Sequence, residues 1–332
     1  MQTMPMARRL FARAALSIAL TLAVVSAAAA QDTYPSRPIR LIVTFPPGGS
    51  TDVMARVLQP RLAELLGQPI VVENKPGAGG NIGVEAVVKS APDGYTIGLA
   101  AAGALTVNPS LMQNVPFDPL KDLTPITEIG ESAFILAAAN GFAPRDVKEL
   151  IALAKGKPGG LSIGHGGNGT AMHLTAELFK HTAGVGLEMV PYRGSGPVTV
   201  DVMAGHIPLG ITDMPSALAL IRDGKLRALA VTSRARVDQM PDTPTLAEGG
   251  LPGFEAVGWY GIVGPAGMPP AVVARLNTAF VTALREPAIR ERIIAVGAVP
   301  KPMTPEEFKA FIVSETKKWS ELIKTTGLKA AN

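Results

Sequence analysis

The chain has 332 residues, no cysteine and a formal net charge of +4. The lack of cysteine excludes disulfides, thiol catalysis and thiolate metal sites, while 47% hydrophobic residues support a packed core. Loss of Arg8, Arg9 and Arg13 with the first 30 residues would reduce +4 by three, to +1. Such a balance argues against a nucleic-acid binder, which needs a strongly basic face.

The first 30 residues have the pattern of a secretory signal peptide. Arg8 and Arg9 precede an Ala-rich apolar run, and small residues stand just before Gln31. We therefore predict export, with a mature chain that begins at Gln31. The arginine pair also resembles a twin-arginine signal, so the general secretory and twin-arginine routes both stay open. A permanent membrane span is disfavoured because hydroxyl residues interrupt the apolar run at Ser17, Thr21 and Ser26.

Strands and helices alternate in the first part of the mature chain. Residues 39–45 read as a strand, and a glycine-rich turn leads into a helix that stops at Gly67. A second strand at 70–73, a helix at 84–90 and a third strand at 95–99 follow. This order predicts a parallel sheet with right-handed crossovers.

The same rhythm restarts at residue 161. Strands are predicted at 161–164, 187–192, 209–212 and 226–231, with helices at 171–182 and 197–204. Two extended segments, 126–139 and 254–263, could join the units, and helices at 270–285 and 304–324 close the chain. We expect an α/β protein of two lobes with parallel-rich sheets. Residues 31–130 and 256–332 would form the first lobe, and 131–255 the second.

The turn after the first strand is a candidate anion site. A helix start leaves backbone N–H groups without partners and carries a partial positive charge, so it can hold a carboxylate or phosphate without lysine or arginine. Glycines let a ligand approach the backbone, and small polar residues can cap the helix. A plain capped turn is the alternative. The candidate residues are Pro47, Gly48, Gly49, Ser50, Thr51 and Asp52.

A second glycine-rich turn occupies the same place in the second unit. It includes Gly167, Asn168, Gly169 and Thr170, and two such turns could face each other across a cleft. Glycines at 164, 166 and 169 also fit a dinucleotide fingerprint, with Glu188 as the ribose-binding acid. Glu188 falls inside its strand rather than at the end, which disfavours that interpretation.

Side chains that could act in catalysis or metal binding show no organised pattern. The four histidines lack metal-ligand spacing, so structural roles are expected for three of them; His173, one turn after the second glycine-rich turn, is a candidate ligand-binding residue. Ser50 and Ser195 are not in a G-x-S-x-G motif, so an exported hydrolase has little support. Arg193 and Asp213 lie at strand ends, where open sheets place ligands; a solvated turn and a helix cap are their structural alternatives.

These residues, in this order, resemble the substrate-binding proteins of tripartite tricarboxylate transporters, the Bug-type receptors. Each motif is modest alone, but their order covers the whole mature chain. The matching stretches are 34–39, 47–52, 67–69, 73–80, 92–96, 168–170 with His173 and 177–179, 191–194, 224–230, 241–245 and 258–261.

The resemblance implies a type II-like Venus-flytrap fold with a cleft between two lobes. It implies a periplasmic, monomeric, non-enzymatic receptor without cofactor, metal or nucleic acid, which hands a small carboxylate to membrane permease subunits. Di- and tricarboxylates and aromatic acids are the expected ligands, and a sensor for a signalling partner stays an alternative. The two turns would hold the ligand, and Gly103, Tyr192, Arg193 and Asp213 would complete the cleft wall. Many members of the family have a hydroxyl in the turn around Gly103, where this chain has Ala101, Ala102 and Ala104, and this difference puts an amino-acid ligand in doubt.

Overall fold

The computed structural model describes residues 34–112, 114–157 and 159–326. The proposed signal peptide lies outside these residues. Residues 37–332 form one unit, and the description below concerns its described part. No helix among the described residues has the length and apolar character needed to cross a membrane.

One half of the unit is built on three parallel strands. They are β1 (Ile39–Val43), β2 (Ile70–Asn74) and β3 (Thr96–Ala101), in the order β2-β1-β3. Leu41, Ile42 and Val43 are fully buried, as expected for the central strand of a sheet that helices cover. The first part of this half also contains α2 (Ser50–Leu66), the 3₁₀ turn η1 (Ala78–Gly80), α3 (Asn81–Val88), the π-turn η2 (Gly103–Val107), α4 (Asn108–Leu111) and α5 (Pro119–Asp122).

The other half repeats the parallel arrangement. Strands β6 (Glu188–Pro191), β5 (Ser162–His165) and β7 (Leu209–Asp213) lie side by side in parallel. Its helices are α6 (Val147–Gly156), α7 (Ala171–Ala183), α8 (Ser195–Ala204) and α9 (Met214–Arg222), and β8 (Arg227–Val231) adds an antiparallel strand.

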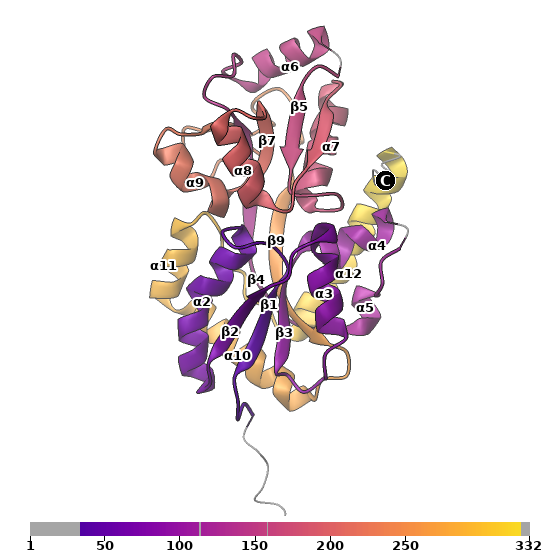
Figure 1. Ribbon diagram of the computed structural model, residues 1–332, viewed down its shortest axis with the longest axis vertical. Coiled ribbons are helices and arrows are strands. Elements are labelled where there is room, and N and C mark those ends of the chain that lie inside the picture. The colour runs from indigo at the N-terminus through magenta and orange to yellow at the C-terminus, as the bar shows by residue number, and fades with distance from the viewer. Residues whose placement is uncertain (1–33, 113, 158, 327–332) are drawn as a thin grey trace, which may run out of the picture. The chain divides into compact units, whose positions relative to one another are not determined.

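Two strands connect the halves (Figure 1). Strand β4 (Leu123–Ala138) pairs with β9 (Val257–Pro265) along Leu123–Ala133, and then with β7 and β8 from Phe134 onward. Strand β9 also pairs antiparallel with β3. The chain therefore crosses between the halves twice, and the sheet order is β2-β1-β3-β9-β4-β7-β5-β6.

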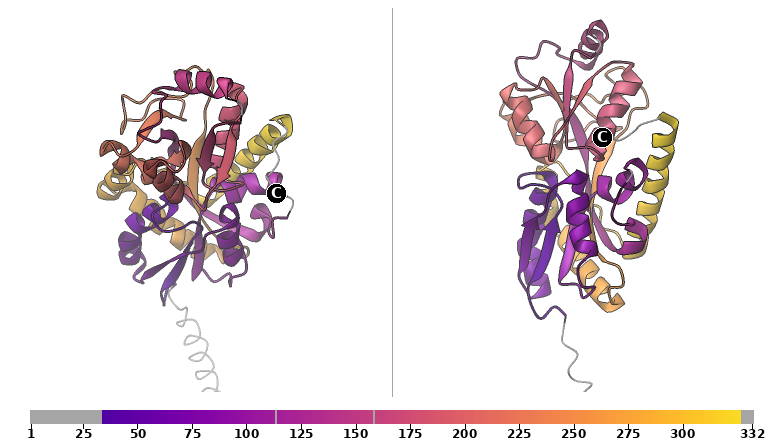
Figure 2. Two further views of the ribbon diagram at one scale, coloured as in Figure 1. Left: turned by 45° about the horizontal axis from the view of Figure 1, so that its top comes forward. Right: turned by 45° about the vertical axis from the view of Figure 1, so that its right-hand side comes forward.

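The C-terminal helices return to the first half. They are α10 (Pro270–Arg285), α11 (Pro287–Ala295) and α12 (Pro305–Thr326), which pack on α2, β4 and η2. Figure 2 shows α12 in yellow along one side of the half that holds the indigo strands. The predicted alternation of two strand–helix units is confirmed. The short helices α4, α5, α6 and α11 were not predicted, whereas the start of α9 agrees with the alternative in which Asp213 caps a helix.

Candidate functional site

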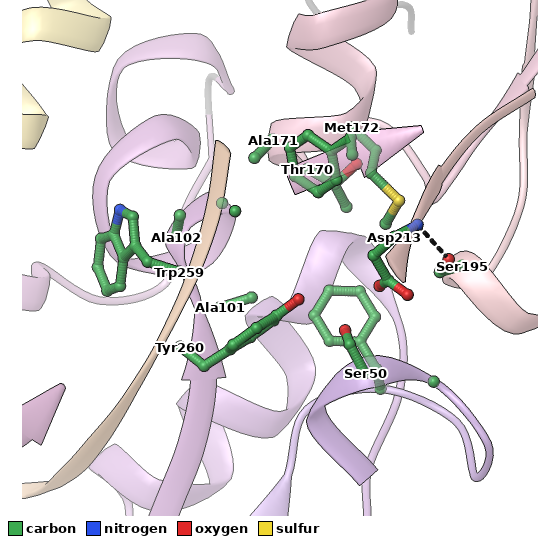
Figure 3. Close-up of a pocket in the computed structure, with 15 residues that line it drawn as sticks. Ser50, Ala101, Ala102, Thr170, Ala171, Met172, Ser195, Asp213, Trp259 and Tyr260 are labelled. Carbon is green, nitrogen blue, oxygen red and sulfur yellow. Dashed lines mark hydrogen bonds between the residues drawn. The ribbon is translucent and has the colours of Figure 1, made fainter. Parts of the chain in front are cut away.

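A cavity lies where the two halves meet, at the ends of strands from both. From the first half come Gly49 and Ser50, and from the second come Thr170 and Asp213. Its volume is about 30 Å³, which is room for about two water molecules. The complete lining is Phe45, Gly49, Ser50, Ala101, Ala102, Gly103, Phe134, Thr170, Ala171, Met172, Ser195, Asp213, Gly258, Trp259 and Tyr260 (Figure 3).

The start of α2 offers free backbone donors at one side of the cavity. The first helical bond runs from Val53 N–H to the Gly49 carbonyl, so the N–H groups of residues 50–52 have no carbonyl partner within the helix. The N-cap is Gly49, which has no side chain. Ser50 therefore does not cap the helix, and its hydroxyl faces the cavity.

Asp52 fixes the shape of this loop from behind. Its Oδ2 accepts the Gly48 N–H (3.0 Å) and Arg56 Nε (2.9 Å), and its Oδ1 accepts Asn74 Nδ2 (3.0 Å). Burial alone would raise the pKa of Asp52, but the bonds from Arg56, Gly48 and Asn74 outweigh burial and lower it. Asp52 is thus an anion that holds the loop and lines no described cavity.

Thr170 builds the facing loop at the start of α7. Its hydroxyl donates to the Gly167 carbonyl (2.8 Å) and accepts the His173 N–H (3.2 Å), so it caps the helix. The His173 ring accepts the Gly169 N–H at Nδ1 (3.4 Å) and lies 4.6 Å from the His165 ring. Burial lowers the pKa of both histidines, that of His165 to about 3, so both rings are neutral. The His173 ring fixes the loop through its hydrogen bond from Gly169.

The strands that connect the halves supply the aromatic wall. Tyr260 comes from β9 and Phe134 comes from β4, while the indole of Trp259, also on β9, points away from the cavity (Figure 3). Gly258 has no room for a side chain, because a Cβ there would lie 2.7 Å from the Phe134 ring.

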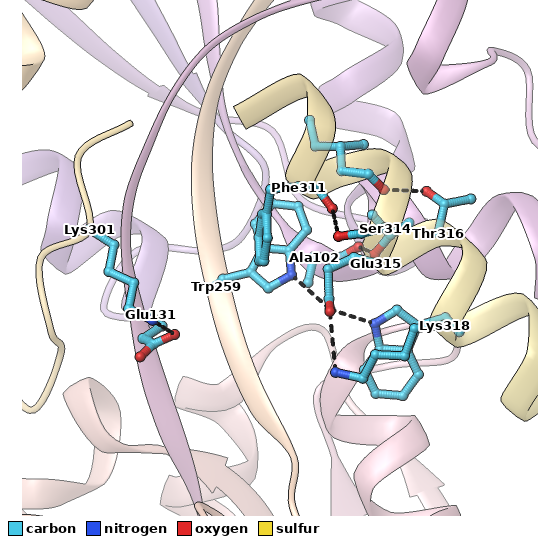
Figure 4. Close-up of polar contacts among 12 residues, drawn as sticks. Ala102, Glu131, Trp259, Lys301, Phe311, Ser314, Glu315, Thr316 and Lys318 are labelled. Carbon is cyan, nitrogen blue, oxygen red and sulfur yellow. Dashed lines mark hydrogen bonds and ion pairs between the residues drawn. The ribbon is translucent and has the colours of Figure 1, made fainter. Parts of the chain in front are cut away.

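Helix α12 holds the indole of Trp259 in place (Figure 4). The ring packs edge-on against Phe308 and Phe311, at 5.8 and 5.2 Å between centroids. Its Nε1 donates to Glu315 Oε2 (3.4 Å), which also accepts Trp319 Nε1 (3.1 Å). The cavity wall is therefore braced by a helix from the far end of the chain.

The predicted site residues fall into four groups. Gly49, Ser50, Gly103, Thr170 and Asp213 line the cavity together. A second cavity of about 300 Å³, which shares Phe45 with the first, holds Gly167, Asn168, Tyr192 and Arg193. A surface hollow holds Pro47 and Gly48, again with Tyr192. The remaining residues line no described cavity; they are Thr51, Asp52, Gly169 and His173.

The aromatic residues and Ser195 were not predicted as site residues. For Trp259 and Tyr260 the sequence held an indication, since residues 258–261 form one of the motifs that carry the family resemblance. Phe45 directly follows the first strand, and Phe134 lies inside a predicted extended segment. Neither pattern says that the residue faces a ligand, because that depends on how the halves meet.

The described lining of the cavity has hydroxyl and carboxyl groups but no basic side chain. Among the described residues it contains no lysine, arginine or histidine, and its polar groups are the hydroxyls of Ser50, Thr170, Ser195 and Tyr260 with the carboxyl of Asp213. Helices α2, α7 and α8 all begin at this cavity. Such a site can hold an anionic group through helix starts and hydroxyls.

Two parallel-rich half-sheets, two crossing strands and a cavity between the halves define a two-lobed solute-binding protein. Residues 54–328 match the family described as the tripartite tricarboxylate transporter family receptor. The chain belongs to this family. It is similar to protein BugT of Bordetella pertussis, at 42% identity over 95% of this chain and 97% of the relative.

Solved structures agree with this assignment. The R. palustris protein Rpa4515, solved with adipate, has a TM-score of 0.87 and 33% identity, covering 89% of this chain and 99% of that one. MatC from Rhodopseudomonas palustris, solved with malate, has a TM-score of 0.83 and 31% identity over 87% and 100%. The predicted α/β two-lobed fold and the family resemblance are both confirmed.

Proposed function

We propose that this chain is a periplasmic receptor that captures a small aliphatic carboxylate and delivers it to the permease subunits of a tripartite transporter. The observation that supports it most is the cavity at the starts of α2, α7 and α8, which has hydroxyl and backbone donors and no basic side chain. The relatives solved with adipate and malate support an aliphatic diacid.

The lobes of this receptor would be residues 31–130 with 256–332, and 131–255. Strand β4 changes its partner from β9 to β7 between Ala133 and Phe134, close to the first of these boundaries. The cavity is smaller than an extended diacid, so we expect the lobes to separate by hinge bending before the ligand enters. The ligand's path into the cavity would be lined by residues that also support the two loops, namely 167–170, His173, Tyr192 and Arg193. We expect the receptor to act as a monomer.

Binding should be tested by thermal shift and calorimetry with adipate, malate, benzoate and glucose. An acid that binds the folded chain at 100 times its Kd adds about 2.7 kcal/mol of stability, so a diacid should raise the Tm by several degrees. Glucose should leave the Tm unchanged. A rise with glucose alone, or turnover of esters that depends on Ser50, would contradict the proposal.

Ser50→Ala is the matched variant for the site. It removes one hydroxyl donor, which should weaken the bound diacid by about five- to tenfold, equal to about 1 to 1.5 kcal/mol. Ser233→Ala removes an exposed hydroxyl that bonds only the Ala235 carbonyl, and it should bind like the unmodified chain.

A further inference from the structure

Asp213 is the one carboxyl group among the described residues that line the cavity. It ends β7, and its side chain is 2% exposed. In Figure 3 its carboxyl points toward Ser50 and Tyr260, across the space where a ligand would lie. A receptor for carboxylates thus has a carboxyl group of its own inside the binding cavity.

The contacts of Asp213 hold it in place without neutralising it. Its Oδ1 accepts the Ser216 N–H (3.1 Å), and its own N–H donates to Ser195 Oγ (2.9 Å). None of the described ion pairs includes Asp213. An anionic ligand would therefore meet this group without a cation between them.

The groups that face Asp213 come from five elements: β9, α2, α8, α9 and β4. Strand β9 contributes Tyr260, whose buried hydroxyl lies beside those of Ser50 and Ser132. Helices α2, α8 and α9 contribute Ser50, Ser195 and the Ser216 N–H, and β4 contributes Phe134. Tyr260 is the only other titratable side chain in the lining, and burial raises its pKa, so it stays a neutral donor.

Two carboxylates cannot both stay ionised at hydrogen-bond distance inside a buried site; such pairs hold one proton between them. We propose that Asp213 shares a proton with the carboxylate of the bound acid, so that capture takes up one proton from solvent. The proton forms an O–H bond on Asp213 and is donated to the ligand carboxylate, while Tyr260 donates to the same group. This rests on the proposed function, and it makes Asp213 the residue that decides which charge state is captured.

The environment of free Asp213 already favours the proton. Burial raises its pKa, and the bonds from Ser50, Ser216 and Ser195 only partly oppose that effect. An anionic ligand raises the pKa further, so the complex binds more protons than its separated parts. Affinity then increases as pH falls, by up to tenfold per pH unit wherever free Asp213 is ionised.

Calorimetry with adipate and malate tests this between about pH 6.5 and 9, where the free acids are fully ionised. The apparent binding enthalpy should depend on the ionisation enthalpy of the buffer, with a slope near one proton in the upper part of the range, and the Kd should weaken as pH rises. Asp213→Asn keeps the Oδ1 acceptor for Ser216 and supplies an N–H donor without titrating. Its slope should be near zero and its Kd independent of pH.

Asp223→Asn is the matched control, because Asp223 is exposed and pairs with Lys225 on the surface. It should keep the slope of the unmodified chain. Binding of adipate or malate without proton uptake would overturn the inference and leave the proposed function intact. Tighter binding of aspartate than malate, lost in Asp213→Asn, would also overturn it, since Asp213 would then pair with an ammonium group as an anion. Failure of every acid to bind either protein would instead contradict the proposed function.

Discussion

Two buried acidic side chains have pKa values shifted in opposite directions. Asp52 receives three hydrogen-bond donors and its pKa falls, whereas Glu128 on β4 has 1% exposure and no partner for either carboxyl oxygen. Burial, and then the nearby charge of Glu131, raise the pKa of Glu128 from 4.5 to about 8. Glu128 is therefore protonated at neutral pH, and its ionisation is a cost to the folded state.

Glu128→Gln should remove that cost. Because the unfolded chain loses this proton near pH 4.5 and the folded chain near pH 8, the unfolding free energy of the unmodified protein falls between these values as pH rises. The slope should approach about 1.4 kcal/mol per pH unit. In denaturant unfolding from pH 4 to 9, the difference in unfolding free energy between the variant and the unmodified chain should grow across this window and then stay constant. Glu291→Gln, at an exposed position, should run parallel to the unmodified chain; equal profiles for all three would contradict this account.

At the scale of elements, the loops before α2 and α7 reach the same geometry by different means. The first has glycine at the N-cap and an aspartate behind the loop, and the second has a threonine cap with a histidine behind it. The sequence was sufficient to place both loops, since each follows a buried strand and contains several glycines. It could not show which hydroxyls cap and which face the ligand, because Ser50 and Thr170 are equally capable of either.

Thr170→Val should loosen the second loop. The valine keeps the shape but loses the bonds to the Gly167 carbonyl and the His173 N–H. Loss of a helix cap costs about 1 kcal/mol of unfolding free energy, and the bound diacid should weaken severalfold because the loop is less fixed. Thr170→Ser retains the hydroxyl and should recover most of the stability. Denaturant unfolding and calorimetry measure both effects, and equal loss in the two variants would show that the methyl group matters instead.

Short helices were the elements that the sequence did not reveal. Helices α9 and α11 each have a proline in the first turn. A proline at such a position is equally typical of a turn without a helix, so it did not predict either helix. The π-turn η2 follows closely on β3 and is buried throughout, so it has no solvent-facing side to give a helical period, and α4 is only one turn long.

At the scale of the whole molecule, the cavity depends on contacts that no local pattern contains. Its aromatic wall comes from Phe134 and Tyr260 on the crossing strands, and Gly103 of the first half lies against the second loop. The sequence predicted two lobes and the loops between which a ligand would lie. It could not predict the register of β4 against β9, which changes at two irregularities and sets the direction of each ring.

Gly103→Ala should hinder closure of the lobes. Its Cβ would lie 2.8 Å from the Gly169 carbonyl oxygen and 3.0 Å from Thr170 Cα, both backbone atoms of the second loop. Overpacking of this size costs about 1 to 3 kcal/mol, so diacid affinity should fall roughly tenfold or more. The Tm without ligand should change little if the lobes can open. Gly141→Ala, where a Cβ meets nothing within 4 Å, is the control. Unchanged affinity in Gly103→Ala would show that this contact is not needed for the bound state.

The path of β9 also has a consequence for how the chain folds. Strand β3 finds its neighbour Tyr260–Val263 only after the whole second half has been synthesised, about 160 residues later. Loop closure over such distances is slow, and high contact order lowers folding rates. Until β9 arrives, β3 presents a bare hydrophobic edge of a kind that favours aggregation. A nascent or truncated chain that stops before residue 257 should therefore need a chaperone, while the completed chain hides that edge inside the sheet.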